Sequence, residues 1–186
     1  WSARWSPQRY LAAASRARDY VHAGDVFQVN LSQAFEAELA AHDEPYAVFE
    51  RLCRASPAPH AAYFRLDAAH VILTNSPERF VSVRSGHVEA RPIKGTRKRS
   101  ADPVEDAALA AELAASAKDR AENLMIVDLM RNDISRVCTP GSVRVPTLCA
   151  VESYANVHHL VSVVEGELDA GHDVFDLVAA SFPPGS

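Results

Sequence analysis

The sequence predicts an α+β fold in which antiparallel sheets carry outer helices. Three observations support this prediction. Short segments of alternating apolar and polar residues fill positions 61–93, two helical patterns follow between residues 102 and 131, and strand-like segments return from residue 142. Strands and helices therefore come in separate runs, without the regular strand–helix–strand alternation that indicates a parallel sheet.

The N-terminal third is predicted to contain two helices and one strand. Ser6-Pro7 provides an N-cap and a first-turn proline for an alanine-rich helix, which Gly24 stops. Residues 26–39 alternate well enough between apolar and polar side chains to predict a strand. Residues 45–55 have the pattern of a short helix.

The middle of the chain is predicted to be a β-meander. The pair Ser85-Gly86 is typical of the tight turn between two of its strands. The strands are expected over residues 62–66, 71–74, 79–83 and 87–93.

Helices are expected next, and then strands again. Residues 102–105, Asp-Pro-Val-Glu, have the pattern of a capping box with proline at the first helical position, which predicts a helix through Ser116. A second helix is predicted over residues 118–131. The remaining elements are strands over residues 142–145 and 149–167 and a final helix over residues 174–180.

Composition excludes several classes of protein. The chain has 186 residues, of which 48% are hydrophobic and 23% charged, as in ordinary globular domains. No apolar stretch approaches the ~18 residues of a membrane span, so we expect no membrane partner. A net charge of -5 argues against a nucleic-acid partner. Three widely spaced cysteines without a CxxC pattern indicate reduced thiols and a cytoplasmic location.

One short segment is strongly basic on this acidic protein. Residues 91–99 contain Arg91, Lys94, Arg97, Lys98 and Arg99, which is compatible with a solvated strand end or with a site for a small anion. Lys94 lies between a proline and a glycine-threonine step. It becomes a candidate nucleophile if neighbouring cations or desolvation supply the neutral amine; a solvated lysine is the alternative.

Two carboxylates and a histidine pair are further candidates. Glu78 follows a Ser-Pro step between two predicted strands and could act as a general acid/base, or be merely exposed. Glu122 opens an apolar helical run, where it could bind Mg²⁺ or interact with the helix dipole. His158 and His159 are adjacent on a predicted strand, so they point to opposite faces and cannot chelate one metal together.

Taken together, several ordered blocks resemble the chorismate-utilising enzymes. The resemblance extends over nearly the whole chain. Its blocks are residues 23–28, 76–80, 91–96, 121–133, 157–162 and 182–186. The resemblance implies that residues 1–186 are the N-terminal portion of the catalytic domain of the chorismate-binding fold, without the C-terminal part of that domain.

The resemblance also implies roles for individual residues. Lys94 is implied to be the nucleophile that attacks chorismate, Glu78 the general acid/base, and His159 the active-site histidine. Thr96 and Gly95 are implied to lie beside the bound ring. Glu122 is implied to be a ligand of Mg²⁺, the expected cofactor, which holds the ring carboxylate.

Within the family, lysine at position 94 is typical of the aminodeoxychorismate-forming branch, which serves 4-aminobenzoate and folate biosynthesis, whereas anthranilate-forming members carry alanine. The expected activity is therefore transfer of ammonia to chorismate. The expected protein partner is a glutamine amidotransferase subunit or fused domain that supplies the ammonia. An anthranilate-, isochorismate- or salicylate-forming enzyme and an inactive scaffold are the alternatives. We expect this chain alone to be inactive.

Overall fold

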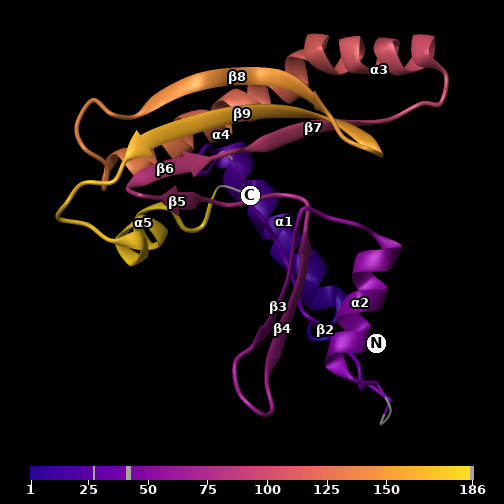
Figure 1. Ribbon diagram of the computed structural model, residues 1–186. Helices are drawn as coiled ribbons and strands as arrows, with labels where there is room; N and C mark the ends of the chain where they lie inside the picture. Colours follow the sequence, from indigo (N-terminus) through magenta and orange to yellow (C-terminus); the bar gives the residue numbers. More distant parts are fainter. Residues whose placement is uncertain (27, 41–42, 185–186) are drawn as a thin grey trace. The chain divides into compact units, whose positions relative to one another are not determined.

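A computed structural model describes residues 1–26, 28–40 and 43–184, and it has the predicted α+β character (Figure 1). The described residues divide into two compact units. One contains residues 1–55 and 63–72, and the other contains residues 56–62 and 73–184. No described helix is both long and apolar enough to cross a membrane.

The first unit is mainly helical, and local signals define its helices. Helix α1, Pro7–Ala23, begins where the Ser6 hydroxyl accepts a hydrogen bond from the Arg9 N–H, and it ends at Gly24 with φ +80°. Helix α2 is Pro45–Ala55, as predicted. Tyr46, on α2, meets Tyr63 edge to face, with the ring centroids 5.3 Å apart.

The strand predicted over residues 26–39 is wrong for its described part. Only β2, Phe35–Glu36, is a strand there, and it pairs with β1, Ser2–Ala3. A strand needs a partner for its main-chain groups as well as an alternating pattern. Here the partner is only two residues long. Phe27, at the start of the predicted strand, lies outside the described residues.

The four predicted strands of the middle region exist, but they do not form one meander. Strand β3, His60–Arg65, pairs with β4, Val71–Ser76, in a separate two-stranded sheet. Strand β5, Ser82–Arg84, pairs with β6, His87–Ala90, around the predicted Ser85-Gly86 turn, where both residues have positive φ.

The main sheet of the second unit is built around β9, Val157–Glu167. Strand β6 pairs antiparallel with residues 164–167 of β9, and β7, Ile93–Lys98, pairs antiparallel with residues 157–161 of it. Strand β8, Arg144–Ser153, also pairs antiparallel with β9. The strand predicted to end at residue 93 is therefore interrupted before Ile93 and continues as β7. Proline explains the interruption, because Pro92 lacks an N–H and restricts the residue before it.

The C-terminal strand prediction also needs correction. Residues 149–167 are not one strand, since β8 ends at Ser153 and β9 begins at Val157. Tyr154 N–H donates to the Val157 carbonyl oxygen across the intervening turn, at 2.8 Å. The turn contains neither glycine nor proline, so no strong turn signal marks it in the sequence.

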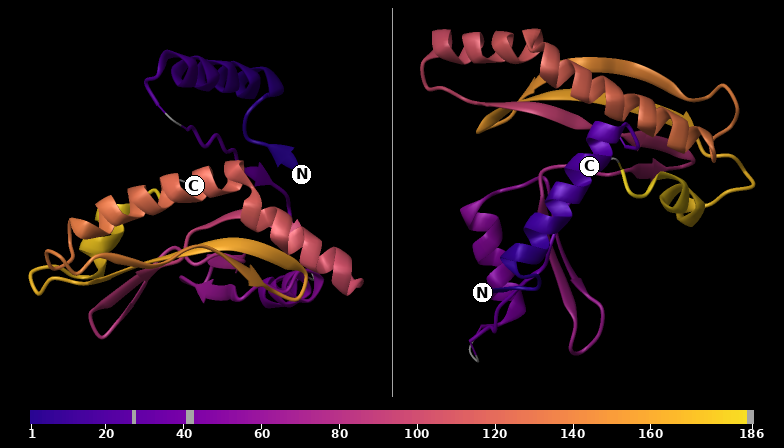
Figure 2. Two further views of the ribbon diagram at one scale, coloured as in Figure 1. Left: turned by 90° about the horizontal axis from the view of Figure 1, so that it is seen from above. Right: turned by 180° about the vertical axis from the view of Figure 1, so that it is seen from behind.

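Three helices accompany the sheet: α3, Pro103–Ala115, α4, Ala117–Ser135, and α5, Val174–Ser181. Helix α4 extends four residues beyond the predicted end and lies along one face of the sheet (Figure 2). Asp102 caps α3 by accepting from the Val104 N–H. The carboxylate of Glu105 instead accepts from Ser100, so the reciprocal half of the expected capping box is replaced.

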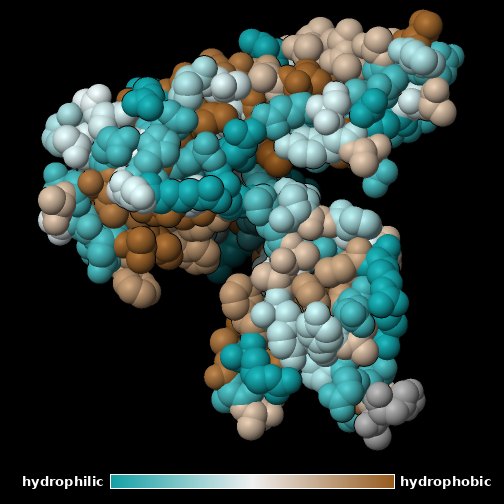
Figure 3. All heavy atoms as spheres, in the orientation of Figure 1, coloured by the Kyte–Doolittle hydropathy of each residue, from teal (hydrophilic) through white to brown (hydrophobic). Residues whose placement is uncertain are grey.

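The core lies between α4 and the sheet, with α5 at one end. Its buried residues are Val88, Ala90, Ile126, Val127, Met130, Ile134, Val137, Cys138, Val164 and Leu177. The apolar run of α4 is only partly buried, because Leu124 and Met125 are exposed. Helix α5 exposes Val174, Phe175 and Val178, which contribute to the brown patch around this helix in Figure 3.

Candidate active site

Lys94 lies inside strand β7, at a β-bulge, whereas the predicted strand ended at residue 93, just before it. Ile93 pairs with Val161 and Thr96 pairs with His159, so Lys94 and Gly95 together oppose a single residue of β9. A bulge bends its strand and changes the direction of the side chains in it. Lys94 is therefore presented at an irregular position of an otherwise paired strand.

Gly95 is required at this bulge for two physical reasons. Its φ of +88° is a conformation that side chains with a Cβ rarely adopt. A Cβ built there would lie 2.8 Å from Asp119 Cβ and 2.9 Å from Leu113 Cδ1. The glycine thus lets the α3–α4 junction approach the strand that carries Lys94.

Glu78 is brought to the start of the same strand. Its Oε1 accepts a hydrogen bond from the Ile93 N–H at 3.0 Å, one residue before Lys94. The Ser76 hydroxyl accepts from the Glu78 N–H at 3.2 Å and holds the loop before it. Two predicted site residues that are 16 positions apart in sequence therefore belong to one neighbourhood.

Thr96 and His159 are in direct contact. They are cross-strand partners on β7 and β9, and Thr96 Oγ1 lies 2.9 Å from His159 Nδ1. The His159 and Tyr154 rings also meet edge to face, with centroids 5.5 Å apart.

The two adjacent histidines have different environments, as expected from strand alternation. His158 is 2% exposed, with Nε2 3.1 Å from Asp106 Oδ1 on α3 and Nδ1 2.8 Å from Ser153 Oγ. His159 lies on the other face of β9, together with Val161. His158 is thus the packed member of the pair.

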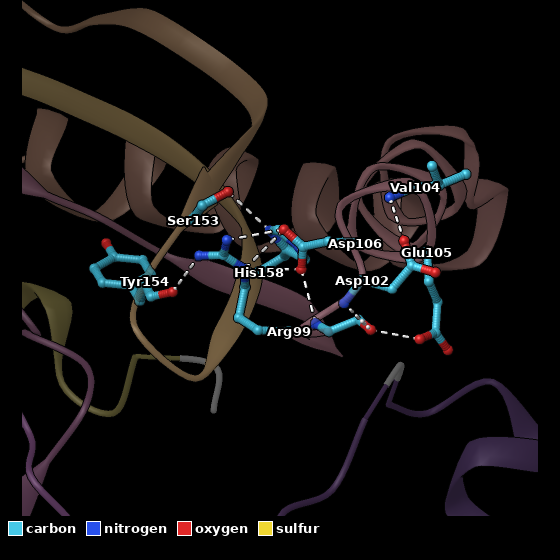
Figure 4. A network of polar contacts seen from close by, with 9 residues as sticks. Arg99, Asp102, Val104, Glu105, Asp106, Ser153, Tyr154 and His158 are labelled. Carbon is cyan, nitrogen blue, oxygen red and sulfur yellow. Dashed lines mark hydrogen bonds and ion pairs between the residues drawn. The ribbon is translucent and has the colours of Figure 1, made fainter.

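The basic segment is largely paired with carboxylates of this chain. Arg91 forms an ion pair with Glu152, and Arg97 with Glu112 and Asp119. Figure 4 shows Asp106 between Arg99 and His158. The Arg99 guanidinium holds the pKa of Asp106 well below its ordinary value. Because these arginines are paired with carboxylates of the chain itself, they do not support the interpretation of the segment as a site for a small anion.

Val161 also lines a cavity on its side of the sheet. The cavity has a volume of about 210 Å³. Its lining includes Ile93 and Arg91 from the region of Lys94, Tyr154 from the β8–β9 turn, and Arg79 from the loop after Glu78. The cavity therefore shares with His159 the face of the sheet that is turned away from α4, whereas Gly95 faces the helices and Glu122 lies on α4.

Glu122 lies on α4. Its carboxylate is 3.8 Å from Lys118 Nζ, and the side chain is 45% exposed. No group of three or more His, Cys, Asp or Glu side chains suited to a metal is found within residues 1–26, 28–40 and 43–184. Mg²⁺ takes one or two protein carboxylates and otherwise water or substrate oxygens. Glu122 fits one position of such a site.

A buried polar network joins α4 to β9 and was not predicted from the sequence. Asn123, fully buried on α4, donates to the Leu160 carbonyl oxygen at 3.1 Å and accepts from the Ser162 hydroxyl. Ser162 Oγ also accepts from the Cys149 N–H at 2.8 Å, where a bulge gives Cys149 a φ of +53°. The sequence signal for this network was the amide of Asn123 next to the apolar run of the helix. The network fixes α4 on β9.

The chain belongs to the chorismate binding enzyme family, whose model matches residues 1–186. Among curated relatives it is 50% identical over its whole length to aminodeoxychorismate synthase component 1 of Klebsiella aerogenes, and 46% identical to that of Escherichia coli strain K12. It is also 41% identical to anthranilate synthase component 1 of Aquifex aeolicus. It covers 41%, 40% and 37% of these relatives, respectively, or about two fifths of their length.

Solved structures agree on the fold. Anthranilate synthase component I of Streptococcus pneumoniae TIGR4 superposes on 99% of this chain with a TM-score of 0.84 at 34% identity, using 40% of its own length. A 2,3-dihydroxybenzoate-specific isochorismate synthase of Bacillus anthracis superposes on 66% of the chain, and on 33% of its own, with a TM-score of 0.57 at 31% identity. The predicted α+β chorismate-binding fold is confirmed.

Proposed function

We propose that the natural gene product carrying this sequence converts chorismate and ammonia into 4-amino-4-deoxychorismate and water. The observation that carries this proposal is the sequence identity of 42–50% to four proteins named aminodeoxychorismate synthase component 1, combined with lysine at position 94. The ammonia would come from a glutamine amidotransferase. The three free cysteines suit a reducing compartment such as the cytoplasm.

Lys94 is the proposed nucleophile. Its neutral amine attacks C2 of the chorismate ring, both ring double bonds shift (C1=C2 to C1=C6 and C5=C6 to C4=C5), and the 4-hydroxyl is protonated and leaves C4 as water. Ammonia then adds at C4, both double bonds shift back, and the Lys94 amine leaves C2. One difficult substitution is thereby divided into two displacements.

Glu78 is the proposed general acid for the departing 4-hydroxyl. Its carboxylate is held one residue from Lys94 by the Ile93 N–H, which gives it a fixed place from which to deliver a proton. His159 and Thr96 act as a pair beside the ring. Their 2.9 Å contact leaves the imidazole Nε2 as the nitrogen that faces away from Thr96.

Glu122 is the proposed protein ligand for Mg²⁺ in this part of the chain. The ion, when bound, would neutralise the ring carboxylate of a dianionic substrate on an acidic protein. Substrate oxygens, water and groups outside the described residues would supply the other ligand positions.

Formation of anthranilate is the second candidate function. It is favoured by the identity of 40–41% to three proteins named anthranilate synthase component 1. We rank it second because lysine at position 94 is typical of the aminodeoxychorismate-forming branch.

Product analysis tests the proposal. The purified gene product is incubated with chorismate, ammonium and Mg²⁺, and the products are separated and identified by mass and fluorescence. We expect 4-amino-4-deoxychorismate, and a loss of at least about tenfold in rate for Lys94→Ala, equivalent to ~1.4 kcal/mol of transition-state stabilisation. Lys98→Ala is the matched control and should retain the rate. Fluorescent anthranilate as the main product would contradict the proposal.

A further inference from the structure

Three side-chain positions form a row across the sheet. Thr96 on β7, His159 on β9 and Glu152 on β8 are direct cross-strand partners. Residues directly opposite on antiparallel strands have Cβ atoms about 5 Å apart and present their side chains on one face. His159 is therefore flanked on both sides within its row.

Tyr154 follows this row in the sequence, and its ring packs against that of His159. Its ring meets the imidazole at an interplanar angle of 61°, and its hydroxyl donates to Glu152 Oε2 at 2.7 Å. Glu152 in turn accepts from Arg91, which lines the cavity next to Val161. The carboxylate of Glu152 raises the pKa of Tyr154, so the phenol stays protonated and remains a donor.

The main chain of Tyr154 is fixed as well. Its N–H donates to the Val157 carbonyl oxygen at 2.8 Å, and its carbonyl oxygen accepts from Arg99 Nη1 at 2.7 Å, as Figure 4 shows for the latter. Arg99 is itself held by Asp106. The carbonyl oxygen of Tyr154 is thus hydrogen-bonded to one ion pair, Arg99–Asp106, and its hydroxyl to another, Arg91–Glu152.

We propose that Tyr154 is a positioning residue for His159, whose ring it holds in the orientation that directs Nδ1 to Thr96 and leaves Nε2 for the substrate. The catalytic relevance of this inference rests on the proposed function. A purely structural role suits Tyr154 poorly, because the residue is 41% exposed and belongs to no buried cluster of the described residues.

A kinetic cycle in the natural gene product tests whether Tyr154 acts through His159. Tyr154→Ala should lower kcat about 10- to 100-fold with KM within about twofold, since small misplacements of catalytic groups cost that much. Tyr154→Phe keeps the ring and should recover most of kcat. In a His159→Ala background, Tyr154→Ala should have no further effect. Equal losses with and without His159, or an unchanged kcat, would overturn the proposal.

The matched control is Ser153→Ala, which lies beside Tyr154 but contacts His158 on the helix side. It should leave kcat within about twofold. A loss equal to that of Tyr154→Ala would instead mean that the whole turn matters and would refute a specific role for the tyrosine.

A second measurement does not depend on turnover. The ¹⁵N NMR signals of the His159 ring should show one well-defined tautomer in the wild type and in Tyr154→Phe, and averaged shifts in Tyr154→Ala. Identical signals in all three would refute positioning. If the gene product makes no 4-amino-4-deoxychorismate, the proposed function fails while this comparison still decides the role of Tyr154.

Discussion

Replacement of Gly95 by alanine should destabilise the second unit through two separable effects. The first is backbone strain at φ +88°, for which a residue with a Cβ costs about 1–2 kcal/mol. The second is overlap with Asp119 and with the fully buried Leu113, both closer than 3.0 Å to the new methyl group. Overpacking of this kind costs roughly 1–3 kcal/mol. The sum is roughly 2–5 kcal/mol, a large part of a typical stability of about 5–15 kcal/mol.

Two further glycines separate these effects. Gly141 has φ +80° with nothing within 4 Å of a built Cβ, so Gly141→Ala reports the strain alone. Gly166 has ordinary backbone but would place its Cβ 2.9 Å from Cys138 Sγ, so Gly166→Ala reports the overlap alone. Urea unfolding of the gene product, followed by circular dichroism, gives the three changes in free energy of unfolding. A loss for Gly95→Ala no larger than that for Gly141→Ala would refute the close approach at the bulge.

Three further predictions concern the helices beside the sheet. Arg99 depresses the folded-state pKa of Asp106, so this carboxylate stabilises the fold above its ordinary pKa of 3.8, and that stability is lost as the pH falls below 3.8. Asp106→Asn should therefore flatten the acid limb of a stability–pH curve below about pH 4. An unchanged limb would contradict the pairing of Asp106 with Arg99. Asn123→Leu should lower the free energy of unfolding in urea by roughly 1–3 kcal/mol, because its buried polar partners lose their hydrogen bonds. Asp128→Asn, at an exposed position of the same helix, should change it by no more than about 0.5 kcal/mol. Equal effects of the two substitutions would contradict a structural role for Asn123. Glu122→Gln should raise the Mg²⁺ concentration needed for half-maximal chorismate binding, measured by calorimetry. Glu112→Gln on α3 is the control and should not raise it. The same Mg²⁺ requirement in both variants would refute Glu122 as a metal ligand.

Local signals predicted the helices well. Ser6, Gly24 and Asp102 each act on their own helix end, so the bounds could be anticipated to within a few residues. Strand pairing could not be predicted in this way. The insertion of β9 beside β6 and β7 joins residues some 70 positions apart, and no local pattern in 87–93 specifies that partner.

The candidate site was predictable to a similar degree. Strand alternation correctly separated His158 from His159, because it depends only on adjacent residues. The bulge at Lys94 was missed, since the conformation of Gly95 is set by Leu113 and Asp119 from the helices that follow. The pairing of the arginines with carboxylates depends on the tertiary fold in the same way.

The proposed function depends most on a covalent bond between Lys94 and the substrate. The direct measurement is the intact mass and peptide map of the gene product after incubation with chorismate and Mg²⁺ without ammonia. We expect an added mass equal to chorismate less one water, located on the peptide containing Lys94, absent from Lys94→Ala and removed when ammonium is added. An unmodified Lys94 in a preparation that still forms 4-amino-4-deoxychorismate would contradict it.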